Sequence, residues 1–207
     1  MATVNLVQLR RELSQQEARI IAPRMKEILN DKFVKEKENL LIEFDNHPVT
    51  VELNEGPSAK SNIIDTAKGG NLFSFFGFDS KAEPAKEIRR VLDNKITKGH
   101  VRRESRGGDK LVYTLETRIP TLQELNSQGQ LVKWTTRSFL DMVEKGISNF
   151  KHYLFDDSGR LKKYSRSGTA IQVKGNIRAS REDTVKPIPY VTKMIQDFMA
   201  NLRNFNR

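Results

Sequence analysis

The residues most able to bind a charged partner form a run of cations toward the carboxyl end of the chain. Between Ser158 and Arg181 no aspartate or glutamate interrupts the sequence. Cations interspersed with serine hydroxyls and glycine suit contacts with phosphate oxygens. This basic stretch indicates either a solvated basic face or a surface for DNA or an acidic protein. Its cations are Arg160, Lys162, Lys163, Arg166, Lys174, Arg178 and Arg181.

A second, less dense group of cations lies on an expected hairpin. It consists of Arg102, Arg103, Arg106 and Lys110, with Glu104 and Asp109 among them. Base-stacking aromatic residues are sparse near both groups, since only Tyr164 lies amid the cations. Non-specific charge complementarity is therefore expected rather than reading of a base sequence.

Residue types that support catalysis or metal binding form no recognisable pattern. His47, His100 and His152 are far apart, and none belongs to an HxxxH or HxE pattern. The phosphate-binding GxxxxGK[ST], the dinucleotide-binding GxGxxG and the nucleophile elbow GxSxG are absent. A chain without cysteine has no disulfide, thiolate metal site or cysteine nucleophile. We expect no catalytic residues, no metal and no cofactor.

Composition indicates one core and a polyanionic partner. The 207 residues are 37% hydrophobic, and 36 Lys plus Arg against 26 Asp plus Glu give a formal charge of +10. No apolar run approaches the roughly 18 residues of a membrane span. The sequence predicts a soluble, non-secreted protein without a membrane partner.

A long amphipathic helix is predicted over about residues 7–37, because apolar residues recur there at helical spacing. Pro23 within it predicts a kink or a junction of two helices. The helix either packs on its own core or forms an arm that docks on a neighbouring assembly. We expect residues 1–38 as this N-terminal helix or arm, and residues 39–207 as a single α+β core.

Two short apolar runs flank the turn signal Asn46-His47-Pro48. Leu40–Phe44 and the alternating Val49–Leu53 predict a pair of strands. The stretch from Gly56 to Gly70 lacks periodicity and predicts a long loop.

Four phenylalanines crowd into six positions: Phe73, Phe75, Phe76 and Phe78. One side of one strand cannot bury so many rings. The segment is therefore either a central strand or a surface that another subunit covers.

The remaining pattern alternates helices and short strands. Ser80 is expected to cap a helix that carries Pro84 and the stripe Ile88, Val91, Leu92 and Ile96. A hairpin (101–105 with 110–118), a capping box (Thr121 with Glu124), a loop with Trp134, a helix (136–150), a strand (169–178) and a helix from Pro189 follow. The predicted class is α+β: a small, mostly antiparallel sheet packed with helices, a long N-terminal amphipathic helix and a C-terminal helix.

Six segments occur in a fixed order between about residues 40 and 175. They are Phe44–Thr50 with Glu52, Gly70–Phe78, Ile119–Thr121 with Glu124-Leu125, Lys133-Trp134, Glu144–Ser148 and Ser165–Gln172. In this order they resemble the neck and tail-completion proteins of long-tailed bacteriophages, especially contractile-tailed ones. The first 35 residues and the C-terminal helix carry no matching motif.

The resemblance implies a non-catalytic virion subunit without cofactor. Such a subunit forms a homo-oligomeric ring, expected to be six-fold with twelve-fold as the alternative. The ring lies between the portal-side connector and the tail terminator or tail tube, and genomic DNA passes through it. Interface candidates are Phe73, Phe75, Phe76, Phe78 and Trp134, and the basic stretch would line the channel.

Two other functions remain open from the residues. The charge also fits a basic nucleic-acid-binding accessory protein that acts as a monomer or dimer. A small enzyme, such as a nuclease without a familiar motif, would need clustered carboxylates for a metal ion.

Overall fold

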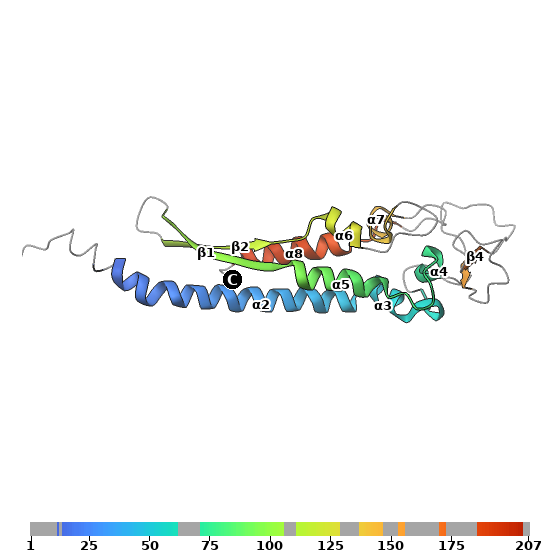
Figure 1. The fold of residues 1–207 in the computed structure, drawn as a ribbon, viewed down its shortest axis with the longest axis horizontal. Helices are drawn as coiled ribbons and strands as arrows, with labels where there is room; N and C mark the ends of the chain where they lie inside the picture. The colour runs from blue at the N-terminus through green and yellow to red at the C-terminus, as the bar shows by residue number, and fades with distance from the viewer. Residues whose placement is uncertain are drawn as a thin grey trace, which may run out of the picture.

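In the computed structural model, one long helix occupies much of the length of an elongated molecule (Figure 1). The structure describes residues 12, 14–61, 71–105, 111–128, 137–146, 153–155, 170–172 and 186–204. The chain is an α+β protein in which a two-stranded antiparallel sheet packs with helices, so the predicted class is confirmed. The elements are η1 (Glu17–Ile21), α2 (Ala22–Asn46), α3 (Pro48–Glu55), η2 (Gly56–Ser58), α4 (Leu72–Phe76), α5 (Pro84–Lys95), β1 (Thr97–Ser105), β2 (Leu111–Arg118), α6 (Leu122–Gln128), α7 (Phe139–Lys145), β3 (Tyr153–Phe155), β4 (Ala170–Gln172) and α8 (Val191–Arg203). The hairpin of β1 and β2, α5 and α8 lie alongside the long helix α2, and α3, α4, α7 and β4 lie beyond its C-terminal end.

The predicted long N-terminal helix is confirmed, and it extends further than the pattern indicated. A π-helical turn, η1, ends at Ile21, two residues before Pro23, and α2 then continues to Asn46. The irregularity expected at the proline thus takes the form of a π turn. The expected boundary at residue 38 falls inside this continuous helix. Phe33 before it and Leu40 after it belong to the same hydrophobic core.

The predicted strand pair at 40–44 and 49–53 is wrong, because both segments are helical. Leu40 and Phe44 lie four positions apart on α2 and are both buried, and Val49 and Leu53 repeat this spacing on α3. Short apolar runs fit a strand or a buried helix equally well. The turn between them is confirmed: His47 Nδ1 accepts from the Val49 amide at 3.3 Å and caps α3.

The phenylalanine-rich segment is a short helix, not a strand. Asn71 caps α4 by accepting from the Ser74 amide at 2.8 Å, and Gly77 ends the helix at a left-handed φ of 69°. These two residues confine the helix to one turn and let it be buried on every side. Phe73, Phe75, Phe76 and Phe78 are 1%, 3%, 0% and 4% exposed.

The alternative in which another subunit covers these rings does not fit their burial within this chain. The rings of Phe76 and Phe78 lie 5.9 Å and 5.7 Å from that of Phe139 on α7, so the chain's own helices cover them. Side chains this deeply buried have almost no surface left for a neighbour.

Helices α5 and α6 follow the predicted pattern with one correction. Ile88, Val91, Leu92 and Ile96 are buried as expected. The residue that precedes α5 is Glu83 rather than Ser80, because Pro84 occupies the first turn. The capping box is confirmed: Thr121 N donates to Glu124 Oε2 at 2.9 Å, and Glu124 N donates to Thr121 Oγ1 at 3.2 Å.

The predicted helix over 136–150 is shorter, because Gly146, with φ 83°, ends α7. The predicted hairpin is confirmed as β1 and β2, paired from Thr97 with Arg118 to Ser105 with Leu111. Of the strand predicted over 169–178, Ala170–Gln172 form β4, which pairs antiparallel with β3; the other residues of that prediction lie outside the described residues.

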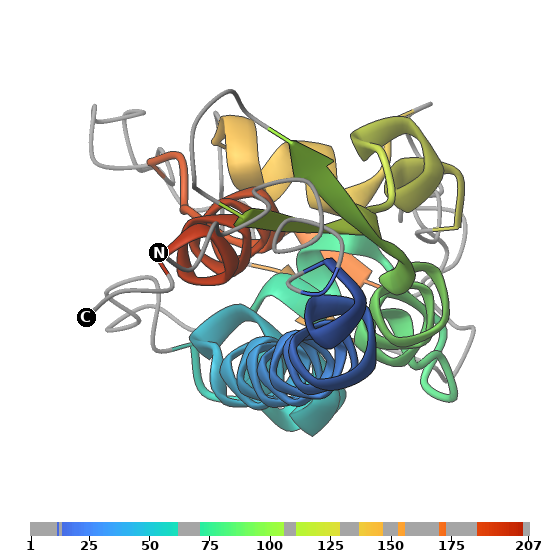
Figure 2. The ribbon, with the colours of Figure 1, turned by 90° about the vertical axis from the view of Figure 1, so that its left-hand side faces the viewer.

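The C-terminal helix begins just after Pro189, as predicted. Figure 2 looks along the molecule and shows α8 on one side of α2, α5 on the other, and the hairpin above them. Phe198 of α8 meets Phe33 of α2 edge to face at 6.0 Å. This contact fixes α8 along α2.

Candidate interaction groove

Figure 1 shows that α2 and the hairpin extend further along the molecule than the C-terminal end of α8. Side chains of α2, the hairpin and α8 line a groove in this part of the molecule. Its volume is about 620 Å³, and α2, β2 and α8 supply its walls. We call it the hairpin groove. It is lined by Met25, Leu29, Lys32, Val112, Tyr113, Thr114, Leu115, Thr117, Ile119, Met199, Leu202 and Arg203.

One wall of the hairpin groove is the edge of β2. Consecutive residues from Val112 to Leu115 line it. Neighbouring side chains on a strand point to opposite faces, so a groove lined by consecutive residues follows the edge. Within the described part of the chain, β2 pairs only with β1. The groove therefore exposes backbone groups that have no ladder partner among the described residues.

The other two walls are apolar with cations at the rim. Met25 and Leu29 come from α2, and Met199 and Leu202 come from α8. At the rim, Lys32 Nζ donates to the carbonyl oxygen of Asn204 at 2.7 Å, and exposed Arg203 ends α8. A cation at a helix C-terminus complements the helix dipole. The groove thus suits an apolar ligand that carries no positive charge.

A polar contact fixes the hairpin beside the groove. Glu17, in the π turn, has a side chain only 7% exposed. Its carboxylate accepts from Tyr113 Oη at 2.8 Å and pairs with Arg103 at 2.7 Å. Burial, and then the hydrogen bond to Glu17, raise the pKa of Tyr113. The two contacts hold β1 and β2 on the first turns of the long helix.

The second cation group is partly used inside the hairpin. Besides Arg103, Arg102 pairs with Glu116 across the strands at 2.8 Å. Arg106 and Lys110 lie outside the described residues. The pairing of β1 with β2 also shifts register between Lys98 and Val101. The described cations of this group therefore stabilise the hairpin.

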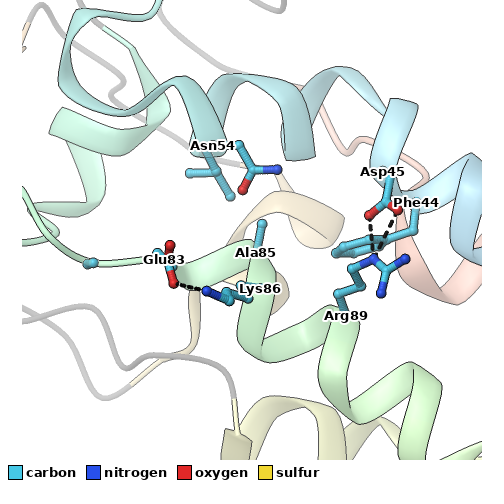
Figure 3. Close-up of a pocket in the computed structure, with 9 residues that line it drawn as sticks. Phe44, Asp45, Asn54, Glu83, Ala85, Lys86 and Arg89 are labelled. Carbon is cyan, nitrogen blue, oxygen red and sulfur yellow. Dashed lines mark hydrogen bonds and ion pairs between the residues drawn. The ribbon is translucent and has the colours of Figure 1, made fainter.

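A smaller surface notch lies between α2, α3 and α5 (Figure 3). It measures about 270 Å³. Arg89 Nε donates to both carboxylate oxygens of Asp45, at 2.8 and 2.9 Å, and Lys86 pairs with Glu83 at 2.6 Å. The Arg89–Asp45 pair joins α5 to α2, and the Lys86–Glu83 pair lies within the first turn of α5. Each charge in the notch thus has a partner, and we interpret the notch as a structural contact.

Buried polar groups elsewhere hold helices together. Glu52 is 1% exposed, accepts from Ser61 Oγ at 2.9 Å, and accepts from the amide of Leu72 at 2.6 Å. Thr50 and Tyr190 share a 2.6 Å hydrogen bond between hydroxyls, and burial strongly raises the pKa of Tyr190. They tie α3 to α4 and to the start of α8. All these groups have structural partners.

The sequence-predicted site residues have different outcomes. The seven cations of the basic stretch and Trp134 lie outside the described residues, so their roles stay predictions. The four phenylalanines lie in the core. The hairpin groove was not predicted from the sequence. One signal was available: Leu111, Val112 and Tyr113 are consecutive, and neighbouring side chains on a strand point to opposite faces. Both faces of this strand are therefore expected to meet other elements.

Metal and membrane patterns are not found in the described part of the chain. None of its groups of three or more His, Asp or Glu could hold a metal ion. None of its helices is both long and apolar enough to cross a bilayer. No protein-family model, curated protein or solved structure matches this chain.

Proposed function

We propose that this chain is a non-catalytic structural subunit of a tailed-bacteriophage virion. It acts as a neck or tail-completion protein and joins copies of itself in a ring at the head–tail junction. The ring connects the portal-side connector to the tail terminator or tail tube and surrounds the DNA channel. Six copies are expected, with twelve as the alternative.

The observation that carries the proposal is the convergence of family-like segments on one core. Glu52, from the first segment, binds the backbone of Leu72 in the second. Leu125, from the third segment, is 1% exposed and belongs to the same core cluster as Phe44 and Phe76. Segments that are far apart in the sequence thus form one physical unit. Such convergence supports a shared architecture more than scattered matches would.

The other half of the molecule offers a surface for assembly. The hairpin groove is built from the N-terminal half of α2, the hairpin and α8, and of its lining only Ile119 belongs to the family-like segments. A closed ring needs head-to-tail contacts between two different complementary patches on each copy. An apolar groove with an open strand edge can serve as one of these patches.

Association of the purified full-length protein tests the proposal. Mass photometry across a concentration series should show one defined oligomer, and negative-stain images should show rings with a central hole. A Val34→Ser variant is a suitable control, since Val34 is exposed at 57% and lies outside the groove. A monomer at every concentration, absent from phage particles, would overturn the assignment.

A further inference from the structure

The corner between α2 and α3 is closed by one histidine. Asn46 ends α2 and Pro48 begins α3, so His47 alone joins the two helices. Its Nδ1 accepts a hydrogen bond from the Val49 amide at 3.3 Å, and its carbonyl oxygen accepts from the Val51 amide at 3.0 Å. The first amides of a helix have no partner within the helix. The ring of His47 therefore supplies an acceptor that α3 itself lacks.

The two ring nitrogens of His47 have opposite hydrogen-bonding roles. Nδ1 accepts from Val49, so it carries no proton. The ring also bonds to the backbone of Pro189, which has a carbonyl but no amide hydrogen, so the ring donates there. A neutral imidazole has one donor and one acceptor, which makes Nε2 the donor. The neutral ring is thus held as the Nε2–H tautomer, between α3 and the residues that precede α8.

We propose that His47 is a proton-operated helix cap, whose neutral ring holds the first turn of α3 and releases it when Nδ1 binds a proton. A protonated Nδ1 is a donor, and it would face the Val49 amide, which is also a donor. The new charge would lie at a helix N-terminus, where the helix dipole disfavours a cation. Both effects weaken the same corner. The inference does not depend on the proposed ring.

α3 is short enough to depend on its cap. It has eight residues, and helices shorter than about 12 residues are marginal without tertiary contacts. Leu53 anchors its C-terminal half in the core. In its first turn, the hydroxyl of Thr50 shares a 2.6 Å hydrogen bond with that of Tyr190. Loss of the cap would therefore weaken the first turn and the contact between α3 and the start of α8.

The carboxylates around this corner have partners of their own among the described residues. On α2, Asp45 is bound to Arg89 of α5, as Figure 3 shows. On α3, Glu52 accepts from the backbone at the start of α4. On α7, Glu144 accepts two hydrogen bonds from the first turn of α8. Each of these anions is thus already engaged by a donor other than His47.

The cap operates at mildly acidic pH. Burial lowers the pKa of His47 from 6.5, and the hydrogen bond to Pro189 opposes this effect. The ring of Tyr190 lies 4.7 Å from that of His47, but burial strongly raises the pKa of its hydroxyl, so it stays protonated in this range. The cap is therefore fully formed above pH 6.5 and opens as pH falls through the lower pKa of the folded state.

NMR titration of the isotopically labelled full-length protein tests the proposal. Near neutral pH the ring nitrogens of His47 should report the Nε2–H tautomer. On acidification, the backbone signals of Val49 and Thr50 should shift with the same midpoint as the ring, while those of α5 stay in place. An Nδ1–H tautomer, or Val49 signals that do not follow the ring, would overturn the cap. Simultaneous loss of the α5 signals would show global unfolding and would also overturn it.

Two variants assign the response to His47. His47→Asn keeps an acceptor that does not titrate in this range, so the signals of Val49 and Thr50 should no longer respond to pH. His100→Asn is the matched control, because His100 is exposed on β1, and it should leave the response unchanged. In the unmodified protein, protection of the Val49 amide against hydrogen exchange should fall roughly fivefold across the titration, as for a lost N-cap. A pH response that persists in His47→Asn would overturn the proposal.

Discussion

Tyr113 donates a 2.8 Å hydrogen bond from Oη to Glu17 Oε1, which joins residues 96 positions apart in the sequence. The contact fastens the hairpin to the first turns of the long helix. It also sets the position of the β2 edge, because Tyr113 lines the hairpin groove. The groove therefore depends on a polar contact at its end as well as on its apolar walls.

Tyr113→Phe should loosen the hairpin without unfolding the protein. The substitution keeps the ring and removes one hydrogen bond, so the free energy of unfolding should fall by about 1 kcal/mol or less. Urea denaturation measures this, and hydrogen exchange should show faster exchange in β1 and β2. Arg102→Ala, which breaks an exposed ion pair, is the control and should change stability less. Equal exchange in Tyr113→Phe and the unmodified protein would contradict the role of this contact.

Phe76→Ala should destabilise the fold, because its ring is fully buried among other rings. Such truncations cost about 3–5 kcal/mol, a large part of the stability of a typical domain. Phe76→Asp should be insoluble or unfolded. Val34→Asp, on the exposed face of α2, should remain folded. A soluble, cooperatively folding Phe76→Asp protein would show that the segment is not core.

Stability should decrease as pH falls below the ordinary pKa of histidine. Burial lowers the pKa of His47 from 6.5, against the opposing effect of its hydrogen bond to the Pro189 backbone. The folded state thus binds the proton less readily than the unfolded chain does. The stabilisation is complete above pH 6.5 and is lost as pH falls through the lower folded pKa.

His47→Asn tests this pH dependence. Asparagine keeps an acceptor at the helix cap but does not titrate in this range. Melting temperatures measured between about pH 7 and about pH 5 should fall less steeply for the variant than for the unmodified protein. Parallel curves would exclude His47 as the source of the effect.

Reversal of charge in the basic stretch should impair phage function more than assembly. A variant with Glu at Arg160, Lys162, Lys163 and Arg166 should still form rings, but particles that carry it should lose infectivity. A fully infectious variant would remove these cations from the functional site.

The purified protein should bind free DNA weakly. Tight binding by a monomer, with affinity that falls steeply as salt rises, would instead favour the accessory DNA-binding function.

Local signals allowed much of the fold to be predicted from the sequence. Thr121 with Glu124 marked a helix start, and Pro189 marked the start of α8, because capping depends on neighbouring residues. Leu40 and Phe44 were misread because a five-residue apolar run fits a strand as well as a helix turn. The choice between helix and strand for these residues becomes clear only when they are considered as the end of the long helix α2.

The candidate site could not be predicted because it depends on distant contacts. The hairpin groove is lined jointly by α2, β2 and α8, which are far apart in the sequence. Lys32 donates a hydrogen bond to Asn204, which lies 172 positions further along the sequence, and no local sequence pattern predicts that contact. The phenylalanine segment shows the same limitation, because its composition did not reveal that Asn71 and Gly77 cap a single buried turn.

Cryo-electron microscopy of the parent phage particle tests the central claim most directly. The account predicts a ring of copies of this chain at the head–tail junction, with density for a neighbour against the β2 edge of each copy. A head–tail junction resolved without this chain would contradict it.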